Sequence, residues 1–173
     1  QVFNITNEWQ YYELLQESNF TDPNCWIMVK FASAGEITID DMEFADVDLT
    51  KLAEGKVNRL GNLVKNSTYE MGSIGWGCYV RGTDYFHEDE IKKEQNYAFT
   101  SDAAYDGKLG LRVTIPEFGI GYVSSHYIAL IPTREYTISC WARADRDNVK
   151  MELGVAGGAF SQGKTVVQTV NLN

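Results

Sequence analysis

The sequence has few of the residues that build catalytic centres. Its 173 residues include two His, His87 and His126, and no His-x-x-x-His spacing. It has neither a Gly-x-Ser-x-Gly elbow nor a phosphate-binding Gly-rich loop. The run Glu88-Asp89-Glu90 could supply the two carboxylates of a glycosidase, but such a run is more typical of a solvated loop. We therefore expect a protein that is not an enzyme.

Positive charge and long apolar runs are also scarce. Lys and Arg number 15 against 24 Asp and Glu, which gives a net charge of −9. Nucleic-acid binding requires a basic surface, so we expect no nucleic-acid partner. There is no run of 18 apolar residues, so we expect no membrane span. The chain starts at Gln1 with no signal peptide, as expected of a piece of a longer protein.

Cysteine is rare and odd in number. Cys25, Cys78 and Cys140 exclude a complete disulfide framework, and they leave open one bridge or three buried thiols. Disulfides are not needed at this length, because a domain of this size buries roughly 70% of its unfolded surface.

Aromatic residues and alternating patterns, in contrast, are abundant. Phe, Trp and Tyr make up 13% of the chain. In 25–31, Cys25, Ile27 and Val29 alternate with Trp26, Met28 and Lys30, and 109–115, 136–143 and 151–155 alternate in the same way. Short alternating runs separated by turn residues predict an all-β fold, an antiparallel β-sandwich. Residues 8–16 suit a helix or a strand equally well.

Several phrases resemble a known family, in an unexpected order. Residues 62–173 begin with a phrase containing Asn66-Ser67-Thr68-Tyr69-Glu70 and end in a strand-like segment, 166–172. Residues 1–48 begin with a similar strand and close with Ile39-Asp40-Asp41. With Gly75-Trp76, 106–111, 136–142 and Glu8-Trp9-Gln10, these phrases resemble the jelly-roll carbohydrate-binding modules of families 4, 16 and 22. The closing part of the module precedes its opening part.

The resemblance implies how the chain is organised. Residues 1–48 would be the closing strands, 49–61 a linker and 62–173 the opening strands of one jelly roll. A cut through a tandem array explains this order most simply; a natural permutation and chance similarity are the alternatives. We expect the two parts to pair within one chain, as a circular permutation, rather than between chains as a domain-swapped homodimer. The resemblance also favours a strand over a helix at 8–16.

The resemblance further implies a structural calcium ion. Calcium binds hard oxygen ligands, chiefly carboxylates and backbone carbonyls. By position, Glu70 and Asp40 would give carboxylates, and the turn around Tyr105 and Lys108 would give carbonyl oxygens. Asp41 is the alternative to Asp40, because a bulge there would change which carboxylate points inward.

A sugar site is implied on outward-facing strand positions. Sugar rings stack on flat side chains, and their hydroxyl groups need polar partners. Tyr122 falls where similar modules often hold a stacking aromatic, and Trp26 lies outside the apolar register of its strand. Phe160 could form the opposite wall of the site. The remaining candidates are outward-facing or polar residues: Trp141, Arg143, Glu152, Lys30 and Gln162. Trp9, Trp76 and Tyr136 fall at positions that are usually core.

We therefore expect a non-catalytic carbohydrate-binding module that binds a polysaccharide or oligosaccharide. It would belong to an extracellular protein, secreted or at the cell surface, and would accompany a catalytic glycosidase domain. One alternative is a structural β-sandwich spacer with no ligand of its own. Another is a small hydrolase or lyase on the same fold, which would need convergent carboxylates or His126 in the cleft.

Overall fold

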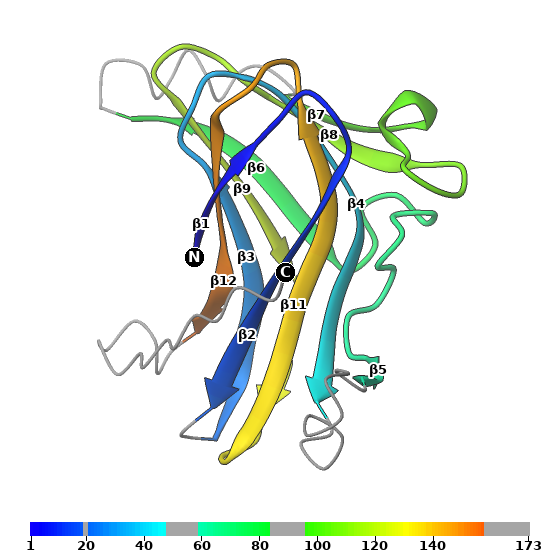
Figure 1. Cartoon of the computed structure of the whole chain (residues 1–173), viewed down its shortest axis with the longest axis vertical. Coiled ribbons are helices and arrows are strands. Elements are labelled where there is room, and N and C mark those ends of the chain that lie inside the picture. Colours follow the sequence, from blue (N-terminus) through cyan, green and yellow to red (C-terminus); the bar gives the residue numbers. More distant parts are fainter. Residues whose placement is uncertain (19–20, 48–58, 84–95, 158–173) are drawn as a thin grey trace.

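The computed structural model describes residues 1–18, 21–47, 59–83 and 96–157, and these are mainly β-strand (Figure 1). The elements, in chain order, are β1 (Val2–Ile5), β2 (Gln10–Ser18), β3 (Asp22–Phe31), β4 (Gly35–Val47), β5 (Arg59–Asn62), β6 (Trp76–Gly82), β7 (Tyr97–Thr100), the short 3-10 helix η2 (Ser101–Ala103), β8 (Gly110–Ile115), β9 (Gly119–Ser125), β10 (Ile128–Leu130), β11 (Arg134–Ala144) and β12 (Val149–Gly157).

The described strands form two antiparallel sheets. The A sheet has the order β1-β12-β3-β9-β6, with β10 paired to β3. The B sheet has the order β2-β11-β4-β8-β7, with β5 paired to β4. The apolar faces of the two sheets meet in one core, which confirms the predicted antiparallel β-sandwich. Residues 8–16 fall largely in β2, so the expected strand is found there.

Each sheet contains strands that precede the expected linker, residues 49–61, and strands that follow it. β3 lies between β12 and β9, and β4 lies between β11 and β8. The linker differs from expectation at its end, because Arg59–Asn62 forms β5. Asn62 anchors this strand: its Oδ1 accepts the Phe44 N–H at 3.1 Å and its Nδ2 donates to the Met42 carbonyl at 3.1 Å. Residues 48–58 and 166–172 lie outside the described residues.

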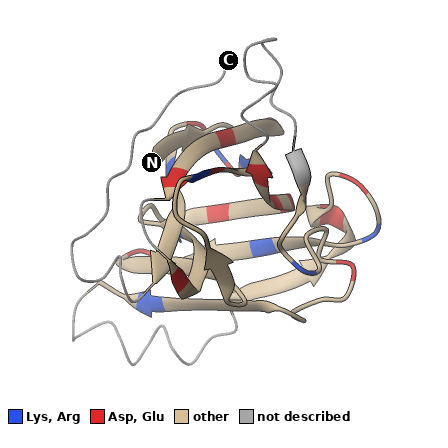
Figure 2. Cartoon of the chain, turned by 90° about the horizontal axis from the view of Figure 1, so that it is seen from below, with Lys and Arg blue, Asp and Glu red and all other residues tan. Residues whose placement is uncertain are grey.

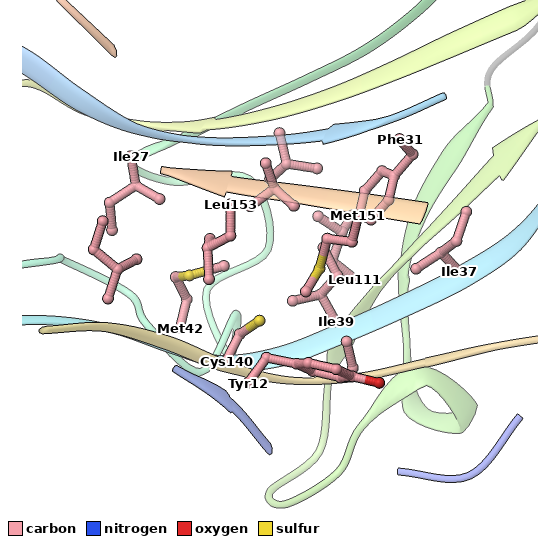
Figure 3. Close-up of a cluster of buried hydrophobic side chains, with 14 of the residues drawn as sticks. Tyr12, Ile27, Phe31, Ile37, Ile39, Met42, Leu111, Cys140, Met151 and Leu153 are labelled. Atoms are coloured by element: carbon pink, nitrogen blue, oxygen red, sulfur yellow. The ribbon is translucent and has the colours of Figure 1, made fainter. Parts of the chain in front are cut away.

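The core lies between the sheets and follows the alternation of the strands (Figure 3). On β3, Ile27, Val29 and Phe31 are fully buried, and Ile39 and Met42 approach them from the B sheet. Burying one such side chain contributes about 1.5–3 kcal/mol. The core therefore fixes which side chains of each strand point outward.

Of the three aromatic residues expected in the core, two are there. Trp76 is 7% exposed, and Tyr136 is 1% exposed and stacks on Phe44 with ring centroids 4.9 Å apart. The expectation for Trp9 is wrong, because it is half-buried on the outer side of the B sheet with Arg143 over its ring. Tyr12 sets the inward register of β2, and Trp9 lies three positions earlier, in the outward register.

Strand β11 departs from simple alternation. Its outward residues Thr137 and Ser139 are 0% and 1% exposed. β11 pairs along its length with both β2 and β4, and Ser139 stands directly between Glu13 and Glu43 in the register. The long side chains of Glu13 and Glu43 thus flank the short side chain of Ser139 on both sides. Alternation therefore predicts the direction of these side chains but not their exposure.

The remaining general features concern thiols, charge and membrane spans. Cys25, Cys78 and Cys140 are free thiols, and burial raises the pKa of each to about 12, so they are inert at neutral pH. Acidic positions are spread over several strands and loops (Figure 2). The described residues contain no helix long and apolar enough to cross a membrane.

Candidate functional site

The outer face of the A sheet carries a row of side chains that crosses four strands. In the strand register Lys30 of β3 stands opposite Tyr122 of β9 on one side and Glu152 of β12 on the other. Tyr122 in turn stands opposite Tyr79 of β6. Directly opposed side chains on one face of a sheet lie about 4.5–5.5 Å apart at Cβ. The side chains of Glu152, Lys30, Tyr122 and Tyr79 are thus neighbours on the outer face of the A sheet.

The two tyrosines of this row form a stacked pair. The rings of Tyr79 and Tyr122 have centroids 4.9 Å apart and an interplanar angle of 17°. Arg81 holds the pair in place, because its NH2 group donates to the Tyr122 hydroxyl at 3.2 Å and its guanidinium carbon lies 5.3 Å from that ring's centroid. Tyr79 is 53% exposed, so the pair presents aromatic surface to solvent.

The charges in this row are compensated. Lys30 Nζ lies 3.0 and 3.1 Å from the two carboxylate oxygens of Glu152. Both side chains are partly exposed, so the pair stabilises the fold little, by about 1 kcal/mol or less. Its effect is to fix polar groups beside Tyr122, where the hydroxyl groups of a ligand need partners.

A second aromatic pair lies further along β3. Trp26 and Tyr127 meet edge to face with centroids 5.8 Å apart. They line a hollow of about 280 Å³ together with Ser124, Ser125 and His126. The Nδ1 atom of His126 is buried and has no hydrogen-bond partner among the described residues. The hollow therefore combines an aromatic wall with the polar residues Ser124, Ser125 and His126.

Mostly small side chains lie between the Tyr79–Tyr122 pair and the Trp26–Tyr127 pair. Trp26 and Lys30 are four residues apart on β3, which places the pairs about 13 Å apart at roughly 3.3 Å per residue. The intervening row consists of Gly154, Met28, Ser124 and Gly77. A Cβ atom on Gly154 would meet open space. Aromatic pairs thus stand at both ends of a floor of mostly small side chains.

Not all predicted sugar-binding residues belong to this face. Trp26, Tyr122, Lys30 and Glu152 share it, whereas Trp141 and Arg143 lie on β11. These two point outward from the B sheet, on the opposite side of the sandwich, and the expectation that they join the same site is corrected here. Alternation tells which side chains leave the core but not which sheet a strand joins. Phe160 and Gln162 lie outside the described residues.

The sequence-based interpretation missed Tyr79, Arg81 and Tyr127. A signal was present for the first two, because Trp76, Cys78 and Val80 alternate with Gly77, Tyr79 and Arg81. For Tyr127 there was none, since it lies in the turn between β9 and β10, where no alternation applies.

The residues expected to hold calcium gather at one place beside the B sheet. Asp40 is fully buried; its Oδ2 accepts the N–H groups of Tyr105 at 2.8 Å and of Asp106 at 3.3 Å. Glu70 Oε1 accepts the N–H groups of Lys108 at 2.6 Å and of Leu109 at 3.0 Å. The turn thus offers the carboxylates its N–H groups, whereas the calcium expectation concerned its carbonyl oxygens.

The charge at this cluster is strongly negative. Burial raises the pKa of Asp40 to about 6, partly offset by the N–H groups that it accepts. Burial also raises the pKa of Asp41, with further contributions from Asp106 and Glu70. Asp41 has a φ of +49°, at a bulge of β4. Asp40 stands opposite Trp141 in the register and is buried beneath the turn at 105–106, whose N–H groups it accepts.

These residues offer calcium the donors that it prefers. Hard carboxylate oxygens are concentrated here. Burial is the main cause of the raised pKa values of Asp40 and Asp41, whereas the N–H groups of Leu109 and Lys108 lower the pKa of Glu70. Within the described ranges, no three His, Cys, Asp or Glu side chains lie close enough to form a ready ligand group. Calcium binding would therefore require the turn at 105–109 to reorient.

Comparisons with protein-family models, curated protein sequences and solved structures found no significant match.

Proposed function

We propose that this chain is a non-catalytic carbohydrate-binding module that holds a neutral polysaccharide on the outer face of the A sheet. The observation that carries the proposal is the placement of two aromatic pairs, Tyr79–Tyr122 and Trp26–Tyr127, at the ends of a low floor. A separation of about 13 Å suits an extended chain of several sugar rings better than a single sugar. The polar groups of Lys30, Glu152 and His126 lie within the same strip.

The chemistry of this face suits binding better than hydrolysis. A glycosidase needs a pair of carboxyl groups, one to donate a proton and one to act as nucleophile or base. Glu152 on this face is held by Lys30 through both of its oxygens. In the parent protein, such a module would raise the effective concentration of a catalytic glycosidase domain at its extracellular substrate.

We also propose that a structural calcium ion stabilises the jelly roll at Asp40, Asp41 and Glu70, with the backbone of Tyr105 and Lys108 completing the site. The ion would neutralise the buried Asp40 and the more exposed carboxylates of Asp41 and Glu70 beside it. The cluster belongs to the B sheet, so calcium would act on stability and not on sugar contacts at the A face.

Affinity electrophoresis against soluble β-glucans, xylans, mannans and pectins tests the binding proposal. We expect at least one polysaccharide to retard the protein. Tyr122→Ala should weaken the retardation roughly five- to tenfold, since an aromatic contact contributes on the order of 1 kcal/mol. Tyr11→Ala, an exposed tyrosine on the opposite face, is the matched control and should leave it unchanged.

Two results would count against the proposal. If no polysaccharide retards the unmodified protein, the structural spacer becomes the better interpretation. If Tyr122→Ala and Trp26→Ala both keep full retardation, the sugar site lies elsewhere.

A further inference from the structure

The first strand, β1, lies at an edge of the A sheet and pairs there with β12. Phe3 and Ile5 point toward the core, and Phe3 meets the ring of Tyr12 edge to face with centroids 5.4 Å apart. Ile5 is fully buried, whereas the outward Val2 is 56% exposed. The slot beside β12 therefore takes a strand with two inward apolar residues and a residue between them that faces outward.

The pattern of β1 recurs near the other end of the chain. Residues 1–6 read Gln-Val-Phe-Asn-Ile-Thr, and residues 168–173 read Gln-Thr-Val-Asn-Leu-Asn. The Gln and the Asn of β1 recur at the same positions. Val170 and Leu172 align with the two inward positions, and Thr169 aligns with the exposed outward position. The later segment thus has the side chains that this slot requires.

The edge of β12 extends further than β1. Gln1 and Leu153 exchange both backbone hydrogen bonds, at 2.8 Å each, and β12 continues from there to Gly157. None of the described strands pairs with this last part of β12 on the side of β1. The N–H and C=O groups along an open edge can pair with a further strand.

A hollow of about 180 Å³ lies beside this part of β12. Its lining includes Leu14 of β2 and both Leu153 and Val155 of β12. If residues 168–173 took the register of β1, Val166 would stand opposite Val155, next to these apolar side chains. A strand formed by 166–172 would therefore fill the slot of β1 and also cover the hollow.

We propose that the edge of β12 is a docking site for residues 166–172 of the same chain, which compete there with β1. These residues lie outside the described part of the chain. Residues 158–165 separate them from the end of β12, so a strand that returns along β12 would run antiparallel to it, as β1 does. The short connection raises the effective concentration of this segment above that of the same segment in a second copy. Docking at this edge does not depend on the function proposed above.

Cross-strand disulfides can report which segment occupies the slot. Antiparallel pairs alternate between hydrogen-bonded and non-hydrogen-bonded pairs, and Gln1 with Leu153 is a hydrogen-bonded pair. Asn4 and Lys150 therefore form a non-hydrogen-bonded pair, with Cα atoms about 4.5 Å apart, a spacing that a disulfide can bridge. Asn171 aligns with Asn4, so both segments can be tested against one position on β12.

Double variants of the full chain are oxidised mildly under folding conditions, and peptide mapping identifies the disulfides. Lys150→Cys with Asn4→Cys should cross-link, because β1 occupies the slot in the structure. Lys150→Cys with Asn171→Cys should also cross-link within one chain. The matched control combines Lys150→Cys with Val170→Cys, which would point to the other face of a docked strand and should react at least tenfold more slowly.

Three results would contradict the proposal. The first is that Asn171→Cys does not cross-link to Lys150→Cys while Asn4→Cys does. The second is that Asn171→Cys and Val170→Cys react equally fast, as expected of random collisions without a docked strand. The third is a disulfide-linked dimer, which would assign the slot to a second copy of the chain.

Urea unfolding tests the competition without any disulfide. If either segment can fill the slot, Ile5→Ala and Leu172→Ala should each lower the midpoint only slightly, and the double variant should lower it by clearly more than their sum. Ile39→Ala, in the core away from β12, is the control, and its effect should be the same with and without Leu172→Ala. An equal effect of Ile5→Ala with and without Leu172→Ala would overturn the proposed competition.

Discussion

The two outer faces of this sandwich are built by the same rule but differ in charge. On the A face the aromatic pairs stand apart, and Lys30 and Glu152 compensate each other in the same row as Tyr79 and Tyr122. On the B face the aromatic residues form one continuous group beside Asp41 and Glu43. Alternation brings aromatic rings to both surfaces, whereas the arrangement of charge determines which ligands each surface favours.

The largest expected effect is one that both faces share. Ile27 belongs to the A sheet and Ile39 to the B sheet, and both are fully buried in the same core. Ile27→Ala and Ile39→Ala should each lower the free energy of unfolding by about 2–5 kcal/mol. Urea unfolding followed by tryptophan fluorescence should show one transition in each variant. Two separate transitions would mean that the faces belong to independently folding units.

Calcium at the B sheet should raise the stability of the protein without changing polysaccharide binding at the A face. At a hundredfold excess over its Kd, calcium should raise the free energy of unfolding by about 2.7 kcal/mol, which corresponds to about 5–10 °C in Tm. Glu70→Gln should remove most of this difference. Polysaccharide binding at the A face should be the same with calcium and with chelator, at a temperature where both forms are folded.

Thermal melting of metal-free protein with and without calcium is the measurement. Coincident curves would remove calcium from the account. A loss of A-face binding in the folded, calcium-free protein would contradict the separation of the two sheets.

Within the A face, the two aromatic pairs should act independently. Trp26→Ala and Tyr122→Ala should each cost on the order of 1 kcal/mol in binding, and the double variant should lose the sum, because sites more than about 10 Å apart are usually additive. Calorimetric titration of the two single variants and the double variant measures the coupling. A double variant no weaker than either single variant would mean that a ligand contacts only one pair at a time.

The smallest expected effect concerns the positioning of Tyr122. Arg81 contacts both the hydroxyl group and the ring of Tyr122. Arg81→Met keeps a long side chain but removes the charge, and it should weaken polysaccharide binding about two- to fivefold, in line with a cation–π contribution of about 0.5–1 kcal/mol. Arg81→Lys should restore part of the loss. An effect as large as that of Tyr122→Ala would instead place Arg81 in direct contact with the sugar.

The sequence predicted the strands well because alternation is a local property. Trp26 and Lys30 leave the core as expected, since the period of two fixes opposite directions for neighbouring side chains. Sheet membership is a property of the whole fold, which is why Trp141 and Arg143 were grouped with Tyr122 although they lie on the other sheet. The sequence of a single strand does not indicate which other strands it pairs with.

Other parts of the site depended on contacts that the sequence does not reveal. Trp9 was expected in the core, but it lies outside the inward register of β2 and packs on Tyr105 and Arg143 instead. Ser139 is buried because Glu13 and Glu43 flank it from two partner strands that are distant in sequence. Asp40 is buried because the turn at 105–106 covers it and donates two N–H groups to it, which the sequence does not reveal.

The indole N–H signals of the four tryptophans offer the most direct test of the account. Trp26 reports on the A face, Trp9 and Trp141 report on the B face, and Trp76 donates its N–H to the Asn66 carbonyl at 2.9 Å in the interior. Single Trp→Phe variants assign the four signals in nuclear magnetic resonance spectra. Titration with an oligosaccharide of the polysaccharide that retards the protein should shift the Trp26 signal and leave those of Trp9, Trp76 and Trp141 in place. A shift at Trp141 with none at Trp26 would place neutral-sugar binding on the wrong face and contradict the central claim.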